Sequence, residues 1–286
     1  MTQPKPNIAI DCGGTNCRAV LRLDGREIDY RGRGANAFSH LDRSQECLRE
    51  AVAALADQSG ADIRDVPCYV SLAGAIDDRI QASVAAALPL SRVVVQEDCM
   101  AAVIGALDGA DGFVAALGTG SFFARSAGGQ VRHIGGYGLT LGDEASGAWI
   151  GRALLARVLM AEEGRSEKSA FLKEVFEEFG GRSRIISAAS TMAPADFAKL
   201  APRVTDAALA PDSGALGILS EGAGLIMQAL FDLGWQSGDA LCLTGGLADA
   251  YESYLPPDAQ SSLVPPQGDG LAGAVILAER FARGAL

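Results

Sequence analysis

The pattern of apolar and polar positions predicts a three-stranded meander within the first 30 residues of the chain. The predicted strands are the short apolar runs at residues 8–10, 19–23 and 27–30. The first turn consists of four small residues, Gly13-Gly14-Thr15-Asn16, and directly before it stands a carboxylate, Asp11. The second turn, Asp24-Gly25, is a strong two-residue hairpin signal.

The first turn has the composition of a phosphate-binding turn. Glycines leave backbone N–H groups uncovered, and successive N–H groups can form a nest for an anion. Asp11 is placed to hold Mg²⁺ through water, because magnesium prefers oxygen ligands and keeps several waters. The spacing is neither that of a dinucleotide fingerprint nor that of a Walker-type loop. An ordinary hairpin whose glycines serve only the turn is therefore the alternative.

The same organisation recurs at residues 113–136. An apolar strand leads into the glycine turn Gly118-Thr119-Gly120-Ser121, and a second strand, a Gly128-Gly129 turn and a third strand follow. Two such meanders about a hundred residues apart predict two related lobes, each with one phosphate nest. Two facing nests could hold the phosphate chain of one nucleotide.

A second carboxylate, Asp98, follows an apolar run at residues 93–95, which predicts a buried strand. Asp98 precedes a predicted helix at residues 99–107, at the kind of place where open α/β sheets bind ligands. Position alone favours an N-cap role, which does not exclude catalysis. Asp143 presents the same alternatives before the helix predicted at residues 145–160, and the pattern again favours the cap.

The remaining elements follow from the same periodicities. Strands are predicted at residues 67–72 and 239–244, the latter leading into Gly245-Gly246, and residues 255–267 form a proline-rich connection. Further helices are predicted at residues 44–58, 82–88, 169–179, 184–192, 195–200, 214–233 and 269–280.

Composition narrows the class of protein. The chain has 286 residues, of which 49% are hydrophobic and 21% charged, as in a globular protein with room for two domains. Its net charge of −11 argues against nucleic acid or an anionic membrane surface as a partner. A bound nucleotide stays compatible with this charge, because a local nest and magnesium act at short range.

Cysteine usage and the chain start predict a cytoplasmic protein. The six cysteines include no C-x-x-C pair and are expected to be buried reduced thiols. The two histidines, His40 and His133, lie at no metal-ligand spacing, so no zinc site is expected. The N-terminus has no apolar signal region, and no apolar run is expected to reach the roughly 20 residues of a membrane span.

Taken in order, these motifs resemble the acetate-and-sugar-kinase, Hsp70 and actin superfamily, and within it the N-acetylglucosamine kinase branch of the BadF/BadG/BcrA/BcrD ATPases. DCGGTNCR at residues 11–18 matches the first phosphate motif and LGTGS at residues 117–121 the second. LTGGLA at residues 243–248 matches the adenosine motif, and EDCMAA at residues 97–102 places the catalytic aspartate on Asp98.

The resemblance implies an α/β fold of two ribonuclease H-like lobes, each with a mixed five-stranded sheet flanked by helices, and a ligand cleft between them. The N-terminal lobe would span residues 1–108 and carry the first phosphate hairpin and the catalytic aspartate. The C-terminal lobe would span residues 109–286. Its terminal helix, residues 269–283, is expected to pack back toward the N-terminal lobe.

The resemblance also implies the site residues. ATP would contact Asp11, Gly13, Gly14, Thr15, Asn16, Gly118, Thr119, Gly120, Ser121, Gly245 and Gly246, with Mg²⁺ held by Asp11 through water. The sugar would contact Asn36, Asp98, Thr119, Gly136, Tyr137, Gly138 and Asp143. Animal N-acetylglucosamine kinases carry tryptophan where Tyr137 stands, which leaves the N-acyl group of the sugar open.

The function implied is ATP-dependent phosphorylation of the 6-hydroxyl of N-acetylglucosamine by a cytoplasmic homodimer. The nearest alternative is a kinase for glucosamine. A BadF-type ATPase that activates a partner enzyme would need cysteines at a dimer interface to hold an iron–sulfur cluster. A nucleotide-dependent sensor without turnover is the remaining alternative.

Overall fold

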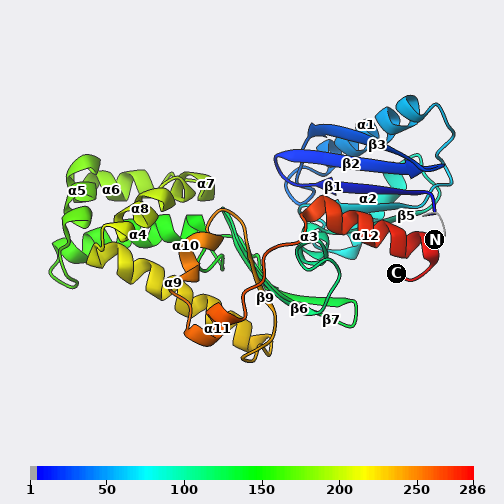
Figure 1. Cartoon of the computed structure of the whole chain (residues 1–286). Coiled ribbons are helices and arrows are strands. Elements are labelled where there is room, and N and C mark those ends of the chain that lie inside the picture. The colour runs from blue at the N-terminus through cyan, green and yellow to red at the C-terminus, as the bar shows by residue number, and fades with distance from the viewer. Residues whose placement is uncertain (1–4) are drawn as a thin grey trace. The chain divides into compact units, whose positions relative to one another are not determined.

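The computed structural model describes residues 5–286, and the N-terminal part of the chain builds a five-stranded mixed sheet (Figure 1). Its strand order is β3-β2-β1-β4-β5. β2 is antiparallel to β1 and β3, whereas β4 is parallel to β1 and β5. The strands are β1 (Asn7–Cys12), β2 (Asn16–Leu23), β3 (Arg26–Arg33), β4 (Cys68–Leu72) and β5 (Val93–Glu97). The meander predicted from the sequence is confirmed.

Alternation along β1 separates two cores. Ile8, Ile10 and Cys12 point to the face covered by α1 (Leu41–Ser59) and α2 (Asp78–Ala87). Ala9 points to the opposite face, which is covered by α3 (Asp98–Ala106) and α12 (Gly270–Arg283). Because successive side chains of a strand alternate, Asp11 shares the face of Ala9.

A second sheet follows in the order β8-β7-β6-β9, with β6 and β9 parallel. Its strands are β6 (Gly112–Leu117), β7 (Ser121–Ala127), β8 (Gln130–Gly135) and β9 (Leu241–Thr244). The helices of this part are α4 (Gly147–Glu162), α5 (Ala170–Phe179), α6 (Arg182–Ala189), α7 (Pro194–Ala198), α8 (Ala201–Leu209), α9 (Ser213–Asp232), α10 (Ala248–Glu252) and α11 (Pro257–Ser261).

The second sheet has four strands among residues 5–286, so the prediction of five strands is wrong for this lobe. Where a fifth strand would lie beside β9, Leu263 makes a single isolated bridge to Leu241. Pro265 and Pro266 follow after Val264. Proline has no N–H to donate to a ladder, so pairing cannot extend through these residues.

The chain folds as two compact units, each with its own core. The first unit runs to Asp111 and also includes Ser126–Val131 and Pro266–Leu286. The second unit comprises Gly112–Arg125 and Arg132–Pro265. The C-terminal segment, far from β1 in the sequence, thus belongs to the unit built around β1.

Two glycines let α12 approach α3 closely within the first unit. A Cβ atom added to Gly273 would collide with the carbonyl oxygen of Ala101, and one added to Gly105 would collide with that of Asp269. Only residues without a side chain permit this backbone contact. It buries Ala274, Leu277 and Ala278 of α12 against Ala9 and Tyr69 of the sheet.

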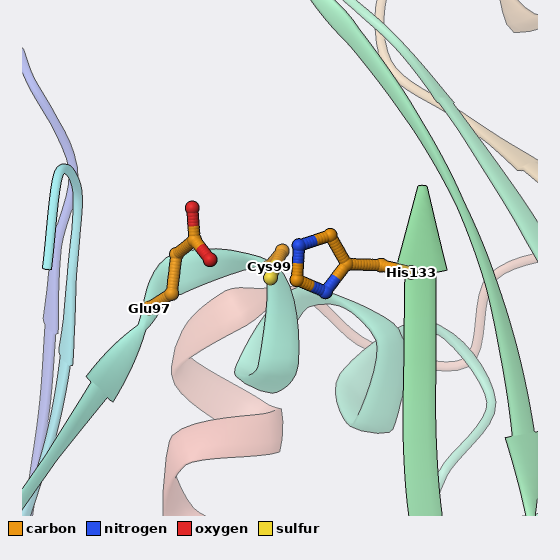
Figure 2. Close-up of side chains that lie close together, drawn as sticks. All are labelled: Glu97, Cys99 and His133. Atoms are coloured by element: carbon orange, nitrogen blue, oxygen red, sulfur yellow. The ribbon is translucent and has the colours of Figure 1, made fainter. Parts of the chain in front are cut away.

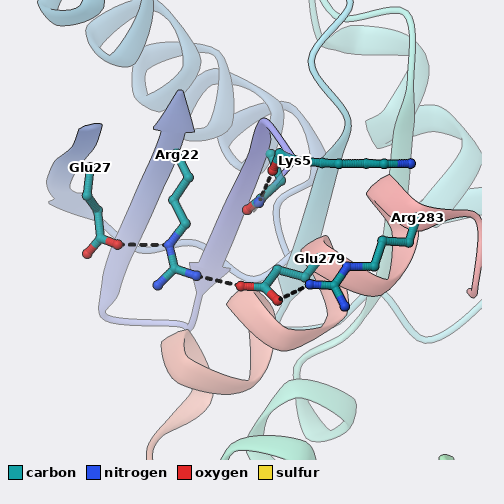
Figure 3. A network of polar contacts seen from close by, with 6 residues as sticks. Lys5, Arg22, Glu27, Glu279 and Arg283 are labelled. Atoms are coloured by element: carbon teal, nitrogen blue, oxygen red, sulfur yellow. Dashed lines mark hydrogen bonds and ion pairs between the residues drawn. The ribbon is translucent and has the colours of Figure 1, made fainter. Parts of the chain in front are cut away.

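Ion pairs tie α12 to β2 as well. Arg18 pairs with Asp269, which caps the N-terminus of α12 by accepting from the Ala272 N–H. Further along β2, Arg22 contacts Glu279 at 2.7 Å, and Glu279 contacts Arg283 at 3.3 Å (Figure 3). Such partly exposed pairs each contribute little to stability. They do fix where α12 lies along β2.

The main helix that was not predicted from the sequence is α8, and a proline in its first turn explains why. The helix predicted at residues 195–200 ends early, in α7, and α8 begins with Pro202 in its first turn. Proline stops a helix when it stands inside one, but it is well suited to the first turn, where its missing N–H is not needed. Two short helices, α10 and α11, were also not predicted.

One helix of the described chain, α9, is long and apolar enough to cross a membrane by length and composition. This differs from the expectation that no apolar run would reach such a length. Half of its apolar window is buried inside the second unit, and core helices of this kind pass the same test.

The close crossing of α3 and α12 predicts the effect of adding one methyl group. Gly273→Ala forces the two helices apart and should destabilise the protein by about 2 kcal/mol. Gly224→Ala is the matched control, because Gly224 lies in α9 with no atom near the added methyl. The control should be neutral or stabilising by up to about 1 kcal/mol. Thermal or denaturant unfolding of both variants measures this. Equal stabilities would contradict the close contact.

Candidate functional site

The ladder register places five polar residues in one line across the first sheet, which we call the polar row. Adjacent strands pair these residues directly, so their side chains share one face. In strand order they are Arg31, Arg18, Asp11, Ser71 and Gln96. The row lies where β1, β4 and β5 end, so it borders the loops that follow these strands.

Asp11 is the centre of the polar row. A guanidinium nitrogen of Arg18 donates to its carboxylate at 2.6 Å, and the Ser71 hydroxyl lies 3.4 Å from its Oδ1. Arg18 also contacts Asp269, so it bridges two carboxylates. These contacts hold the Asp11 carboxylate in place at the foot of the first glycine turn.

The first glycine turn has its carbonyl groups tied back into the protein. The carbonyl of Gly13 accepts from the Ala35 N–H at 3.1 Å, and that of Thr15 accepts from the Gly34 N–H at 2.9 Å. Within residues 5–286, no backbone hydrogen bond engages the N–H groups of Gly14 and Thr15, and both residues are exposed. The turn therefore offers two free donors while most of its acceptors are engaged, as in an anion nest.

A polar cavity of about 560 Å³ lies over this turn and the adjoining part of the polar row. Its lining residues are Asp11, Gly13, Gly14, Thr15, Asn16, Cys17, Arg18, Arg31 and Gly32. Two arginines and a run of free N–H groups favour a ligand with several negative charges.

Asp98 lies at the end of β5 as the first residue of α3. The N-cap position predicted for it belongs to Glu97, whose side chain makes no capping bond. Figure 2 shows its neighbours Glu97 and Cys99 at the start of the helix. Burial raises the pKa of Asp98 to about 6, with further contributions from the charges of Glu97 and Asp11. This carboxylate is ionised at neutral pH yet holds a proton more readily than an ordinary aspartate.

The second glycine turn repeats the organisation of the first. The carbonyls of Leu117, Gly118 and Thr119 accept from the N–H groups of Leu247, Gly147 and Ala148 at 3.1, 2.8 and 3.1 Å. In the described part of the chain, the N–H groups of Thr119 and Gly120 make no backbone hydrogen bond. This turn also presents donors alone.

Gly245 joins the predicted adenosine motif to this second turn. It has a φ of +91°, and a Cβ atom there would collide with the carbonyl oxygen of Leu117. Both the left-handed backbone and the close approach require glycine. The two motifs, more than a hundred residues apart in sequence, form one surface of the second unit.

Asp143 connects the second turn to the turn predicted to bind sugar. It is not the cap of α4, because Ser146 holds that position and accepts from the Trp149 N–H. The Asp143 carboxylate is buried and accepts from the N–H groups of Ser121 and Gly138. Burial nevertheless raises its pKa. The predicted cap role is wrong, and the side chain instead fixes Gly138 beside the phosphate turn.

Tyr137 is 68% exposed between Gly136 and Gly138, both of which have positive φ. A cavity of about 290 Å³ adjoins it. Apolar side chains line this cavity together with the carboxylates of Glu144 and Asp232. The lining residues are Phe123, Ile134, Gly135, Tyr137, Leu141, Gly142, Glu144, Leu225, Gln228, Ala229 and Asp232.

Asn36, the predicted sugar-binding asparagine, uses its side-chain oxygen for hydrogen bonds within its own loop. Its Oδ1 accepts from the N–H groups of Phe38 and Ser39 at 3.1 and 3.2 Å. These bonds orient the side chain, so the Nδ2 amide is the group that it could offer to a ligand.

A comparison with protein-family models matches residues 8–278 to the BadF/BadG/BcrA/BcrD ATPase family. The chain belongs to this family. It is 28% identical over 278 residues to the glucosamine kinase GspK of Vibrio cholerae, with 95% of each chain covered. It therefore shares nearly its whole length with a relative named as a kinase.

Solved structures agree with the fold of this BadF-type chain. A presumed N-acetylglucosamine kinase from Chromobacterium violaceum superposes with a TM-score of 0.79 at 30% identity, covering 95% of this chain and 98% of that one. A ROK family glucokinase from Streptomyces griseus, solved with glucose and AMPPNP, gives a TM-score of 0.55 at 21% identity. The match covers 96% of this chain and 99% of the glucokinase chain. The α/β fold with two sheets flanked by helices, expected from the sequence, is thus confirmed.

Several polar residues of this family member were not predicted as site residues: Arg18, Arg31, Ser71, Gln96 and Glu144. The first two could have been found by counting pairs outward from the first turn, since hairpin register places Arg18 opposite Asp11 and Arg31 opposite Arg18. Ser71 and Gln96 depend on parallel pairing between distant segments, which a short sequence pattern does not reveal.

The raised pKa of Asp98 predicts a pH-dependent effect on stability. Its folded pKa of about 6 exceeds the usual 3.8, so ionisation of Asp98 weakens folding as the pH rises from about 4 through 6. Asp98→Asn cannot ionise and should be more stable than wild type at pH 7.5 by on the order of 1–2 kcal/mol. This advantage should disappear near pH 4.

Denaturant unfolding at both pH values measures the effect. Asp24→Asn, at an exposed turn carboxylate, is the matched control for the substitution itself. An Asp98→Asn variant with the same stability change at both would contradict the raised pKa.

Proposed function

We propose that this protein transfers the γ-phosphoryl group of ATP to the 6-hydroxyl of N-acetylglucosamine. The observation that carries the proposal is the pair of glycine turns with tied carbonyls and free N–H groups, one in each unit. Membership of an ATPase family whose relatives are named as amino-sugar kinases supports it.

The two turns would bind the phosphates of one nucleotide. Residues 13–16 offer N–H groups beside Arg18, and residues 118–121 offer a second set. Gly245 and Gly246 would let the adenosine approach the backbone. Phosphoryl transfer needs alignment and charge neutralisation more than covalent chemistry, and this is what fixed N–H donors provide.

Mg²⁺ fits the donors of the polar row. The Asp11 carboxylate and the Ser71 hydroxyl are hard oxygen ligands at the foot of the first turn. Magnesium keeps several waters, so these residues would hold it through water. When bound, the ion would neutralise charge on the transferred phosphate.

Asp98 would act as the general base. Its pKa of about 6 leaves it ionised at neutral pH while keeping enough proton affinity to accept the proton of the attacking hydroxyl. The Nδ2 amide of Asn36, the Gly136-Tyr137-Gly138 turn and Asp143 would hold the sugar, and Thr119 would lie near it. In this proposal residues 1–108 and 109–286 act as the two functional lobes.

The cavity beside Tyr137 bears on which amino sugar is used. Its apolar walls suit the methyl group of an N-acetyl substituent. Glu144 and Asp232 in the same cavity suit the ammonium of glucosamine, and this favours glucosamine as the second candidate. The kinase relative from Vibrio cholerae is named for glucosamine.

The cysteines do not have the exposure that the partner-activating ATPase would need. All six cysteines are buried, whereas a shared iron–sulfur cluster needs cysteines presented at an interface. A cytoplasmic homodimer stays a prediction from the family.

A sugar panel tests the proposal. Phosphorylated product should form with ATP and Mg²⁺ from N-acetylglucosamine, and NMR of the product should place phosphate on the 6-hydroxyl. Glu144→Gln should leave turnover of N-acetylglucosamine within about twofold, but should raise the KM for glucosamine by about tenfold if an ammonium binds there. Lack of turnover with every sugar would exclude a sugar kinase.

Asp98→Asn should keep sugar binding but lower kcat by about 10²-fold or more, because the base is lost while the contacts remain. Steady-state kinetics and calorimetric titration of the sugar measure the two effects. Asp24→Asn controls for the chemistry of the substitution and should retain wild-type kcat. Near-normal turnover in Asp98→Asn would remove Asp98 from the base role.

A further inference from the structure

Two free cysteines face each other at the base of the first glycine turn. Cys12 ends β1, Cys17 lies at the start of β2, and the ladder pairs them directly. Only residues 13–16, the turn itself, separate them in sequence. The Cys17 thiol hydrogen-bonds to the sulfur of Cys12. The proposed chemistry uses neither thiol, since both point to the face opposite Asp11.

The backbone geometry of this pair suits a covalent bond. The carbonyl of Cys12 accepts from the Ala73 N–H beyond β4, so the polar groups of Cys12 point away from β2. Cys12 and Cys17 are therefore a non-hydrogen-bonded pair, in which Cα atoms lie about 4.5 Å apart. A disulfide spans Cα separations of about 4.4–6.8 Å. Little backbone movement is needed to form one.

The strand cysteines elsewhere lack such a partner. Cys68 in β4 is paired with Ile8 and Val93, and Cys242 in β9 with Val114. Cys47 is buried on α1, near enough to Cys12 for an electrostatic interaction, but it belongs to no strand. Among the four strand cysteines, register thus singles out one dithiol.

We propose that Cys12 and Cys17 form a modification site, which hydrogen peroxide oxidises to an intramolecular disulfide that locks the first glycine turn. One sulfur attacks a peroxide oxygen, the O–O bond breaks, and a sulfenic acid and one water form. The second sulfur attacks the sulfenic sulfur, the S–O bond breaks, and a second water leaves. The two thiols lose two electrons and two protons, and the peroxide takes up both.

Both thiols are almost fully buried, so oxidation proceeds through local opening of the hairpin end. Gly14, Thr15 and Asn16 are exposed, so solvent reaches this end of the hairpin. Once formed, the bond holds the two sulfur atoms about 2.05 Å apart and fixes β1 and β2 to each other under the turn. Its effect on activity rests on the proposed function of that turn, whereas its formation does not.

The test uses the full-length reduced protein, treated with hydrogen peroxide in its folded state. Intact mass should fall by two hydrogens, and peptide mapping should find Cys12 linked to Cys17, with reversal by dithiothreitol. Cys17→Ser should abolish the link and Cys47→Ser should retain it, with Cys12→Ala as a second variant if Cys17→Ser does not fold. Links through Cys47, or none in folded protein, would overturn the site.

Activity provides a separate arm. Oxidation should lower sugar-dependent ATP turnover by about tenfold or more, since small displacements of phosphate-binding groups are costly. Dithiothreitol should restore it, and Cys17→Ser should resist the peroxide. Mg²⁺ with a non-hydrolysable ATP analogue should slow the link by holding the turn closed. If the reduced protein shows no turnover, the proposed function is wrong, but the disulfide proposal is unaffected. If a protein that carries the Cys12–Cys17 link is fully active, the disulfide does not lock the turn.

Discussion

Hydrogen bonding of the backbone at the two glycine turns is the constraint on which the rest depends. Each peptide unit carries one donor and one acceptor. A turn that leaves both groups free has no preference for an anion over a cation. Here segments from elsewhere in each unit satisfy the acceptors: the Gly34–Ala35 segment for the first turn, and the starts of α4 and α10 for the second. The remaining N–H groups of the turns face solvent and carry a positive partial charge. The elements that look peripheral therefore give the turns their selectivity for anions.

Strand register extends this constraint to the side chains. Asp11 and Cys12 are neighbours in β1, yet they lie on opposite faces of the sheet with different partners. A slip of one residue in the β1–β2 pairing would exchange the faces and bring the thiols into the polar row. The packing of Ile8 and Ile10 against α1 prevents that slip. An apolar core thereby fixes the position of a carboxylate on the other side of the sheet.

Local signals were enough to predict part of this molecule. The meanders and the glycine turns follow from short patterns, because hairpin pairing joins residues that are close in sequence. The pairing of β9 with β6, the burial of Asp98 and the hydrogen bonds of Asp143 depend on distant segments. The cap role predicted for Asp143 failed for this reason: a carboxylate just before a helix suggests a cap, and only the fold reveals that Ser146 already caps it.

The position of α12 has a consequence for how the chain is made. The sheet face bearing Ala9 and Tyr69 is covered by Ala274 and Leu277, close to the C-terminus. These covering residues follow the whole second unit in the sequence, so this face stays exposed to solvent until the second unit has been synthesised. The second unit is nearly continuous in sequence and can fold while still tethered. Biosynthesis thus separates the order of synthesis from the order of folding, because the first unit completes its core only after the second unit has been made.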